Sequence, residues 1–247
     1  MGTVVVTGAS RGIGAATALA AAGRGHDVAV GYRSAADDAE AVVGRCRALG
    51  VRAEAIAVDV AVEDEVVELF ARVDRTLGPL EAVVANAGVV SPQARLDRFD
   101  AARIDAVFAV NVRGALLCAR EGVRRLSTTH GGDGGSIVFV SSAAARHGSP
   151  GEYIDYAATK GAIDTATVGL AKEVAGEGIR VNGVRPGIID TDIHASGGDP
   201  GRAARMAAGL PMGRVGTADE VAEAIVWLLS PAAGYVTGAI LDVSGGR

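Results

Sequence analysis

The chain has 247 residues, which is enough for one large α/β domain. It is 49% hydrophobic, and its formal net charge of −5 leaves no excess of Lys and Arg for binding the phosphates of a nucleic acid. No run of basic residues predicts binding to a membrane surface. No apolar run approaches the roughly 18 residues that a membrane span needs, and no charged signal-peptide region precedes the first strand pattern. Cys46 and Cys118 stand alone in helical patterns, so we expect reduced thiols in a cytoplasmic protein.

Short apolar runs alternate with helical patterns along the whole chain. The predicted strands cover residues 3–8, 27–32, 53–60, 80–88, 136–142, 179–187 and 238–246. The predicted helices cover residues 14–23, 35–49, 62–76, about 100–127 with a break near Asn111, 154–176 and 217–230. In the last helix, Thr217 and Glu220 form a predicted capping box, and Trp227 and Leu228 are expected in the core.

Nearly continuous apolar strands between helices indicate strands that are covered on both faces. We therefore predict an α/β fold with one domain over residues 1–247. Its expected architecture is a Rossmann-type, doubly wound parallel sheet of about seven strands with helices on both faces.

A glycine-rich turn lies between the first strand and the first helix, where "VVVTGASRGIGAATALA" contains Gly8, Gly12 and Gly14. Glycine lets the backbone turn tightly and approach a pyrophosphate, while the helix N-terminus supplies amide donors and partial positive charge. The spacing is GxxxGxG rather than GxGxxG, and in a chain with 35 glycines the motif alone also fits ordinary turn chemistry. Its position at the first strand-to-helix junction favours dinucleotide binding.

The residues after the second strand indicate which dinucleotide is bound. An acidic residue there would bind the ribose hydroxyls of NAD, but the strand ends with Tyr32 and Arg33. Arg33 and Arg11 could both bind a 2′-phosphate through charge-assisted hydrogen bonds. We predict NADP(H), although Asp37 and Asp38 follow closely and leave NAD(H) as the alternative.

One of only two lysines in the chain follows a tyrosine by four residues in "GEYIDYAATKGA". On a helix, Tyr156 and Lys160 share a face, whereas Tyr153 lies two turns from Lys160. A free phenol has a pKa near 10, and we expect a nearby ammonium and a cationic nicotinamide to lower it toward the working range. The alternative is a random surface pair, which is how we interpret Lys172 with the glutamates around it.

A set of motifs extends this pattern over the chain: "TGASRGIG" (7–14), "DV" (59–60), "NAG" (86–88), Asn111 in "VFAVNVRGAL", "VSS" (140–142), "YAATK" (156–160), "RPG" (185–187) and "YVTGAILDVSGG" (235–246). In order and spacing these resemble the short-chain dehydrogenase/reductase family over essentially the whole length. The most similar branch is that of the 3-oxoacyl-carrier-protein reductases and related NADP-dependent carbonyl reductases.

The resemblance implies roles for four catalytic residues. Tyr156 would donate the proton in reduction and act as the base in oxidation, and Lys160 would lower its pKa and hold the nicotinamide ribose. Ser142 would hydrogen-bond the substrate oxygen, and Asn111 would hold a water between Lys160 and solvent. The implied cofactor-binding residues are Gly8, Ser10, Arg11, Gly12, Ile13, Gly14, Arg33, Asp59, Val60, Asn86, Ala87, Gly88, Tyr156, Lys160, Pro186, Gly187, Ile188 and Thr191.

The chain departs from the family pattern between the catalytic serine and the tyrosine. Ser142 and Tyr156 are one residue farther apart than in many members, and the extra residue falls in the loop "RHGSPGEYID". Ser141 is the alternative to Ser142, but neighbouring residues on a strand point to opposite faces, so we expect Ser141 to be structural. Tyr153 fits either the substrate pocket or simple packing.

The remaining features give expectations about ligands and partners. His26, His130, His147 and His194 are scattered in turns, so we expect surface histidines and no metal site. Residues 190–214 are expected to form a mobile lid that selects the substrate, hinged at Gly197-Gly198. The resemblance implies a homotetramer that pairs through the helices near 100–125 and 154–176 and through the last strand.

The sequence thus favours an NADP(H)-dependent oxidoreductase that interconverts a carbonyl and a secondary alcohol of a small molecule. A 3-oxoacyl thioester presented by a carrier protein is one such substrate. The alternatives are a sugar or alcohol dehydrogenase that works toward oxidation and, in a different class, a dinucleotide-binding sensor without catalysis. The complete set of Ser142, Tyr156, Lys160 and Asn111 argues against the sensor, because a sensor needs no proton relay.

Overall fold

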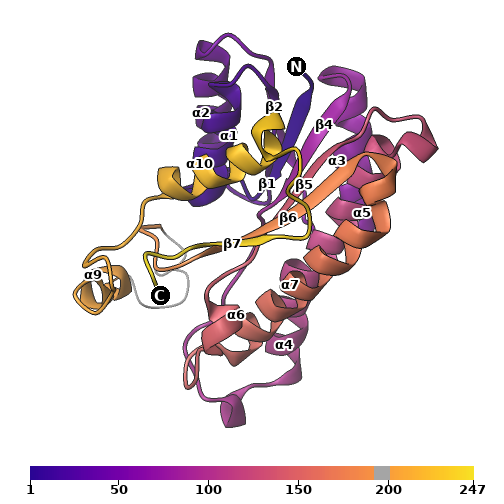
Figure 1. The fold of residues 1–247 in the computed structure, drawn as a ribbon. Helices are drawn as coiled ribbons and strands as arrows, with labels where there is room; N and C mark the ends of the chain where they lie inside the picture. Colours follow the sequence, from indigo (N-terminus) through magenta and orange to yellow (C-terminus); the bar gives the residue numbers. More distant parts are fainter. Residues whose placement is uncertain (192–200) are drawn as a thin grey trace.

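The computed structural model describes residues 1–191 and 201–247, without the side chains of residues 202–204. In this part of the chain, seven parallel strands form one sheet in the order β3-β2-β1-β4-β5-β6-β7, with helices on both sides (Figure 1). This is the Rossmann-type α/β sheet that the sequence predicts. The strand order reverses at β1 and β4, and ligands of such sheets bind outside the carboxyl ends of the strands at this point.

The seven strands and the longer helices agree with the predicted ranges to within a few residues, whereas α6 and α9 were not predicted. The strands are β1 (Thr3–Thr7), β2 (Asp27–Tyr32), β3 (Ala53–Ala57), β4 (Leu80–Ala85), β5 (Gly135–Val140), β6 (Ile179–Pro186) and β7 (Ile240–Val243). The α-helices are α1 (Gly12–Ala22), α2 (Ala36–Ala48), α3 (Glu63–Thr76), α4 (Ala101–Phe108), α5 (Ala115–Leu126), α6 (Ala144–His147), α7 (Ile154–Val174), α9 (Arg202–Ala207) and α10 (Ala218–Leu229). The short helices are η1 (Leu96–Arg98), η2 (Ala109–Gly114), η3 (Thr128–His130), η4 (Ala175–Glu177) and η5 (Pro231–Ala233).

The hydrophobic core consists of two layers, one on each face of the sheet. Successive strand residues point to opposite faces, so Val4 and Val6 of β1 pack in the layer with α1, α2 and α10, whereas Val5 packs in the layer with α3, α5 and α7. Figure 1 shows the same division, with α1, α2 and α10 on one side of the sheet and α3, α5 and α7 on the other. Burial on both faces explains why the strands are apolar throughout.

Three predictions about the elements need comment. The predicted break near Asn111 is a π-helical turn, η2, between α4 and α5. The last strand is shorter than predicted, because Gly238, Gly245 and Gly246 have positive φ angles that end extended pairing. The capping box at Thr217 is present. Trp227 is 42% exposed rather than in the core, because α10 buries the side that carries Val226 and Leu228, and Trp227 lies outside that side.

The predicted lid over residues 190–214 falls in part on residues 192–200, which include its predicted hinge and lie outside the described residues. On either side of them, Ile189 pairs with Gly216 in an isolated parallel bridge, and α9 follows at Arg202. Among the described residues, no helix combines the length and the apolar character needed to span a membrane.

Candidate active site

The glycine-rich turn packs directly against the end of β4. A Cβ atom on Gly14 would collide with the carbonyl oxygen of Gly8 and would lie 2.6 Å from Nδ2 of Asn86. A Cβ atom on Gly8 would lie 2.9 Å from Cα of Ala87, and Gly8 also has a φ of +64°. Glycine is therefore required at both positions, by close approach of the backbone and by conformation.

The side chains of Thr7 and Asn86 join the ends of β1 and β4. Nδ2 of Asn86 donates to the carbonyl oxygens of Thr7 at 2.8 Å and Gly8 at 3.0 Å. The backbone amides of Asn86 and Ala87 both donate to Oγ1 of Thr7 at 3.1 Å. Sequence reasoning did not single out Thr7, although a polar residue that ends a buried strand is a signal for such a role.

A cleft at the switch point, which we call the glycine-turn cleft, is lined by Gly8, Ser10, Arg11, Gly12, Ile13, Gly14, Tyr32, Arg33, Ser34, Ala35, Val58, Asp59, Val60, Asn86, Ala87, Gly88, Val89, Val90, Val110 and Thr191. These include every predicted cofactor-binding residue from Gly8 to Gly88, together with Thr191. Apart from Thr191, which follows β6, these predicted residues follow four neighbouring strands, β3, β2, β1 and β4, at the sheet edge where such sheets bind nucleotides.

The charges and donors of the glycine-turn cleft suit an anionic ligand. The N-cap of α1 is Arg11, whose side chain does not cap the helix, so the first amides of α1 are available to a ligand. Arg11 and Arg33 are exposed, and neither side chain makes a hydrogen bond or ion pair with another described residue. Asp37 and Asp38 lie in the first turn of α2 and do not line this cleft.

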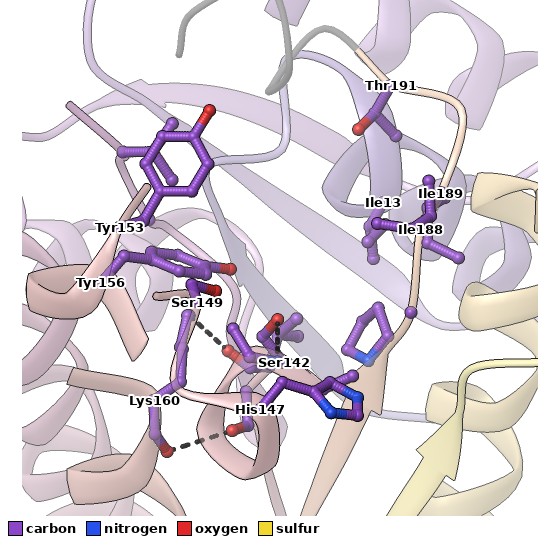
Figure 2. A pocket seen from close by; sticks show the side chains of 18 of the residues that line it. Ile13, Ser142, His147, Ser149, Tyr153, Tyr156, Lys160, Ile188, Ile189 and Thr191 are labelled. Atoms are coloured by element: carbon purple, nitrogen blue, oxygen red, sulfur yellow. Dashed lines mark hydrogen bonds between the residues drawn. The ribbon is translucent and has the colours of Figure 1, made fainter. Parts of the chain in front are cut away.

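A second hollow, which we call the tyrosine pocket, continues from the glycine-turn cleft. It is lined by Ile13, Asn86, Gly88, Val90, Val140, Ser141, Ser142, Ala143, Ala144, His147, Ser149, Tyr153, Tyr156, Lys160, Pro186, Gly187, Ile188, Ile189, Thr191 and Arg247. In Figure 2, Tyr156, Ser142 and Lys160 lie on one side of the pocket and Ile13, Ile188 and Thr191 on the other. Ile13, Asn86, Gly88, Val90 and Thr191 line both hollows, so the two meet.

Ser141 and Ser142 both line the tyrosine pocket, but their hydroxyls have different partners. The Ser142 hydroxyl lowers the pKa of the Tyr156 phenol, and Oγ of Ser142 accepts a hydrogen bond from the amide of Ala144 at 3.1 Å. Ser141 is 2% exposed, and its hydroxyl donates to the carbonyl oxygen of Lys160 at 3.1 Å. The alternation of side chains just after β5 thus agrees with the different partners of the two hydroxyls.

Lys160 lies one turn beyond Tyr156 on α7, and its side chain is buried at 4% exposure. The ammonium donates to the carbonyl oxygen of Val140 at 2.7 Å and lies 5.5 Å from the centre of the Tyr156 ring. Burial lowers the pKa of Lys160 to about 8, and the negative charge of Asp164 acts in the opposite direction. Lys160 is therefore placed beside the phenol, with a pKa close to neutral pH.

The expected lowering of the Tyr156 pKa does not appear in this structure. Burial of the phenol raises its pKa, and the influence of the Ser142 hydroxyl offsets only part of the increase. The prediction took charge as the main influence, but desolvation is larger here, and the Lys160 ammonium bonds to Val140 rather than to the phenol. In the structure as it stands, Tyr156 is a phenol that holds its proton at neutral pH.

Asn111 connects the segment after β4 to α7. Its Oδ1 accepts from the amide of Val89 at 2.8 Å, and its Nδ2 donates to the carbonyl oxygen of Val89 at 2.9 Å and to Oγ1 of Thr159 at 3.2 Å. A Cβ atom on Gly88 would lie 3.5 Å from both Oδ1 of Asn111 and Nζ of Lys160. The four predicted catalytic residues therefore gather around the tyrosine pocket, with Asn111 behind Gly88.

The comparisons with known proteins agree with this geometry. A family model described as enoyl-(acyl carrier protein) reductase matches residues 8–247. The chain is 51% identical to "Uncharacterized oxidoreductase YgfF" of Escherichia coli over 247 residues, which cover 100% of both chains. The protein belongs to the short-chain dehydrogenase/reductase family. It is an oxidoreductase that acts on alcohol and carbonyl groups.

Other members of the short-chain dehydrogenase/reductase family differ in substrate and cofactor. "Cis-4-hydroxycyclohexanecarboxylate dehydrogenase" of Sinomonas cyclohexanicum is 41% identical, over 98% of this chain and 94% of that one. A Burkholderia cenocepacia short-chain dehydrogenase in complex with NADP superposes with a TM-score of 0.91 at 35% identity, covering 99% and 97% of the chains. A 3-ketoacyl-(acyl-carrier-protein) reductase of Brucella melitensis complexed with NADH has a TM-score of 0.92 at 30% identity, covering 100% and 98%.

A buried ion pair that sequence reasoning missed holds the start of α7 in this family member. Asp155 accepts from Nε of Arg103 at 2.7 Å, and the two side chains are 2% and 13% exposed. Arg103 also donates to the carbonyl oxygen of Pro92 at 2.6 Å, and Asp155 accepts from the amide of Tyr156 at 2.9 Å. The pair thus ties the segment after β4 to the first turn of α7, where Tyr156 lies.

Charged residues behind Lys160 form a second group that the sequence did not reveal. Asp164 lies one turn after Lys160 on α7, and its Oδ2 accepts from Arg185 of β6 at 2.8 and 2.9 Å. Asp242 of β7 accepts from Arg146 at 2.7 Å and is 3.5 Å from Arg185. Arg185 therefore neutralises part of the Asp164 charge that reaches Lys160.

The loop with the extra residue supplies three residues to the tyrosine pocket: His147, Ser149 and Tyr153. Tyr153, whose place the sequence left open, is a pocket residue with 7% exposure. His147, expected only as a surface histidine, is exposed and also lines the pocket. In the sequence, the extra residue of this loop was the feature that could have indicated that its residues line the pocket. Among residues 1–191 and 201–247, no group of three or more His, Cys, Asp and Glu is placed to hold a metal ion.

Proposed function

We propose that the protein transfers hydride between NADP(H) and a carbonyl or secondary alcohol of a small molecule. The observation that supports this most directly is the meeting of the glycine-turn cleft with the tyrosine pocket, where Ser142, Tyr156 and Lys160 converge. A dinucleotide that extends from one hollow to the other would bring its reactive ring beside the phenol.

The residues of the glycine-turn cleft fit a dinucleotide. The α1 amides behind the glycine turn suit the pyrophosphate, and Asp59 and Val60 would border the adenine. Asn86, Ala87 and Gly88 would pass along the cofactor, and Tyr156 and Lys160 would hold the ribose next to the nicotinamide. The remaining contacts, to the nicotinamide carboxamide, come from the segment Pro186, Gly187, Ile188 and Thr191, and Thr191 reaches the glycine turn at Gly12.

In reduction the protein's own residues handle the oxygen and its proton. The cofactor, when bound, supplies the hydride to the carbonyl carbon. Ser142 donates a hydrogen bond to the carbonyl oxygen, and the Tyr156 phenol transfers its proton to that oxygen as negative charge develops there. The ammonium of Lys160 stabilises the phenolate that remains. The carbon gains a hydride and the oxygen a proton, which gives the alcohol.

The raised pKa of Tyr156 suits its proposed role as proton donor in reduction. Burial raises the pKa of Tyr156, so the phenol is protonated and can donate, whereas alcohol oxidation needs the phenolate as base. A dehydrogenase acting on sugars or other alcohols remains the alternative. It predicts that the oxidative rate rises with pH as Tyr156 loses its proton.

NADP(H) is our proposal for the cofactor because two exposed cations, Arg11 and Arg33, line the glycine-turn cleft. The acidic residue Asp59 also lines this cleft, and its Oδ1 accepts a hydrogen bond from the amide of Ala61 at 2.9 Å. Asp38 lies near Arg11 in a neighbouring surface hollow and could weaken this preference. A net positive charge beside the adenosine ribose would favour a 2′-phosphate.

A sensor that binds dinucleotides without catalysis is the rival from another class. We would measure NADPH consumption with a panel of ketones, sugars and 3-oxoacyl thioesters for the parent protein, Tyr156→Phe and the control Tyr235→Phe. Tyr235 is fully exposed, so its loss tests only the removal of a hydroxyl. We expect Tyr156→Phe to lower kcat by about 10²- to 10⁴-fold and the control to keep the parent rate. Full activity of Tyr156→Phe would contradict the assigned role, and an inactive parent across the panel would favour the sensor.

We also propose that the protein is a cytoplasmic homotetramer. Its described cysteines are free and buried, as is usual in a reducing compartment. Apolar side chains that a monomer would expose lie on α4, α5 and α7: Ile104, Phe108, Leu116 and Val168. Light scattering should show that Leu116→Glu breaks the assembly, while Val67→Glu on α3, which is exposed to a similar degree, leaves it intact. A parent protein that is monomeric would overturn the proposal.

A further inference from the structure

The lengthened turn between α6 and α7, residues 147–153, forms a polar wall of the tyrosine pocket. His147, Ser149 and Tyr153 of this turn line the pocket beside Ser142 and Tyr156. In the view of Figure 2, the His147 ring lies next to Ser142 and extends toward the side that Ile188 and Ile189 occupy. The wall therefore adds polar groups beyond those that the proposed proton transfer uses.

The backbone of this turn is held in an unusual conformation at Ser149. Its φ is +45°, and among the described residues it is the one non-glycine residue with a positive φ. The Ser149 carbonyl oxygen accepts from the amides of Glu152 at 3.2 Å and Tyr153 at 3.1 Å, which closes the turn. Glycine would adopt this conformation without strain, so the serine retains a hydroxyl at the pocket at a conformational cost.

The polar wall offers hydrogen-bond donors and no negative charge. The hydroxyl of Ser149 and the imidazole of His147 can both donate, and Tyr153 and Arg247 also line the pocket. Within the described part of the chain, no Asp or Glu lines the tyrosine pocket. The His147 imidazole makes no hydrogen bond or ion pair with another described residue, so it is available to a ligand.

A carboxylate is the substituent that matches this set of groups. It accepts hydrogen bonds only, and no Asp or Glu among the described lining residues opposes its charge. A hydroxyl could use the same donors, but hydrogen bonds to an ionised carboxylate are stronger. The opposite side of the pocket, with Val90, Ile188 and Ile189, is apolar and suits a hydrocarbon skeleton.

We propose that the substrate is an oxo acid or hydroxy acid, and that His147 together with Ser149 binds its carboxylate while Ser142 and Tyr156 act on the carbonyl or alcohol. This inference rests on the proposed function, because it concerns the same pocket. It names a substrate class that the catalytic residues alone do not define.

The test compares oxo acids with their methyl esters, which keep the shape and remove the charge. We would use 4-oxocyclohexanecarboxylate and 4-oxopentanoate, each with its ester, and measure kcat/KM with NADPH and with NADH. The ratio of acid to ester should exceed tenfold for at least one pair. His147→Leu should bring this ratio close to one, and His147→Lys should preserve it because a hydrogen-bond donor remains.

Two further variants sharpen the assignment. Ser149→Gly removes the hydroxyl but accepts the positive φ, and it should lower the ratio by a few fold. His130→Leu, at an exposed histidine in η3, should leave the ratio unchanged. An unchanged ratio in His147→Leu would overturn the role of His147.

The outcomes also separate this inference from the proposed function. Esters that are reduced as fast as the acids, in a reaction that needs Tyr156, would overturn the carboxylate site and leave the oxidoreductase chemistry standing. Preference for a hydroxylated ketone over the acids would do the same and would assign the polar wall to hydroxyl recognition. Absence of turnover with every ketone and acid tested would contradict the proposed function itself.

Discussion

The glycine-turn cleft and the tyrosine pocket are built in different ways. Main-chain geometry shapes the cleft: the turn at Gly8 and Gly14 touches the backbone after β4, and helix amides supply donors. Side chains shape the pocket, and they come from segments that are far apart in the sequence, such as Ser142 after β5 and Lys160 on α7. The cleft should therefore be sensitive to any added atom, and the pocket to the chemistry of single side chains.

The largest expected effect is on catalysis in the tyrosine pocket. Lys160→Met removes the buried ammonium beside Tyr156, and we expect kcat to fall by about 10²- to 10⁴-fold. Lys172→Met is the matched control, because it removes the other lysine of the chain from an exposed position on the same helix. Steady-state kinetics of both variants would check this. A Lys160→Met variant with more than a tenth of the parent kcat would show that the amine is dispensable.

An added methyl group should damage the glycine-turn cleft. In Gly14→Ala the new Cβ would meet the Gly8 carbonyl and Asn86, so we expect a loss of about 1–3 kcal/mol in the free energy of unfolding. Gly169→Ala in α7 is the control, since nothing lies within 4 Å of its Cβ position, and it should stabilise the protein by up to about 1 kcal/mol. Urea denaturation measures both. Equal stability of the two variants would mean that the turn can relax.

A change of charge in the glycine-turn cleft should alter the choice of cofactor. Arg33→Asp replaces a cation with an acid that can bind ribose hydroxyls, and we expect the kcat/KM ratio of NADPH to NADH to fall by about 10- to 100-fold. This range corresponds to the loss of one charge-assisted hydrogen bond of about 1.5–3 kcal/mol. Arg98→Asp makes the same charge change on an exposed residue outside the cleft and should leave the ratio unaltered. A parent enzyme that prefers NADH would refute the NADP(H) proposal.

The smallest expected effect concerns the pH profile. The pKa of Lys160 is about 8, below its ordinary value, so the ammonium is present at pH 7 and is lost above about pH 8. The reductive rate should fall on that alkaline side. Asp164 raises the pKa of Lys160, so Asp164→Asn should move the falling limb to lower pH. Asp133→Asn, at an exposed loop position, should not move it, and an unmoved limb in Asp164→Asn would rule out the electrostatic link.

The sequence predicted the parts of the molecule that follow from local rules. The alternation of apolar runs identified the strands, and the period of two agrees with the different partners of the Ser141 and Ser142 hydroxyls just after β5. The position of the glycine turn placed the cleft. These inferences succeed because each depends on a few neighbouring residues and on backbone geometry.

The parts that the sequence did not predict depend on contacts between distant segments. The pKa of Tyr156 is raised rather than lowered because desolvation depends on all the segments around the phenol. Arg103 and Asp155 are 52 positions apart, and no motif links them. His147 lines the pocket because of the path that the lengthened turn takes. The spacing of motifs in the sequence does not determine that path.

The π-helical turn η2 sets a limit on length changes near Asn111. A π turn holds one residue more than an α turn, so deleting a single residue from Ala109–Gly114 would let α4 and α5 fuse into one regular rod. Asn111 lies inside this wide turn, and a regular α turn would change the position of its side chain. The contacts that Asn111 makes with Val89 and Thr159 therefore depend on the irregular backbone of η2.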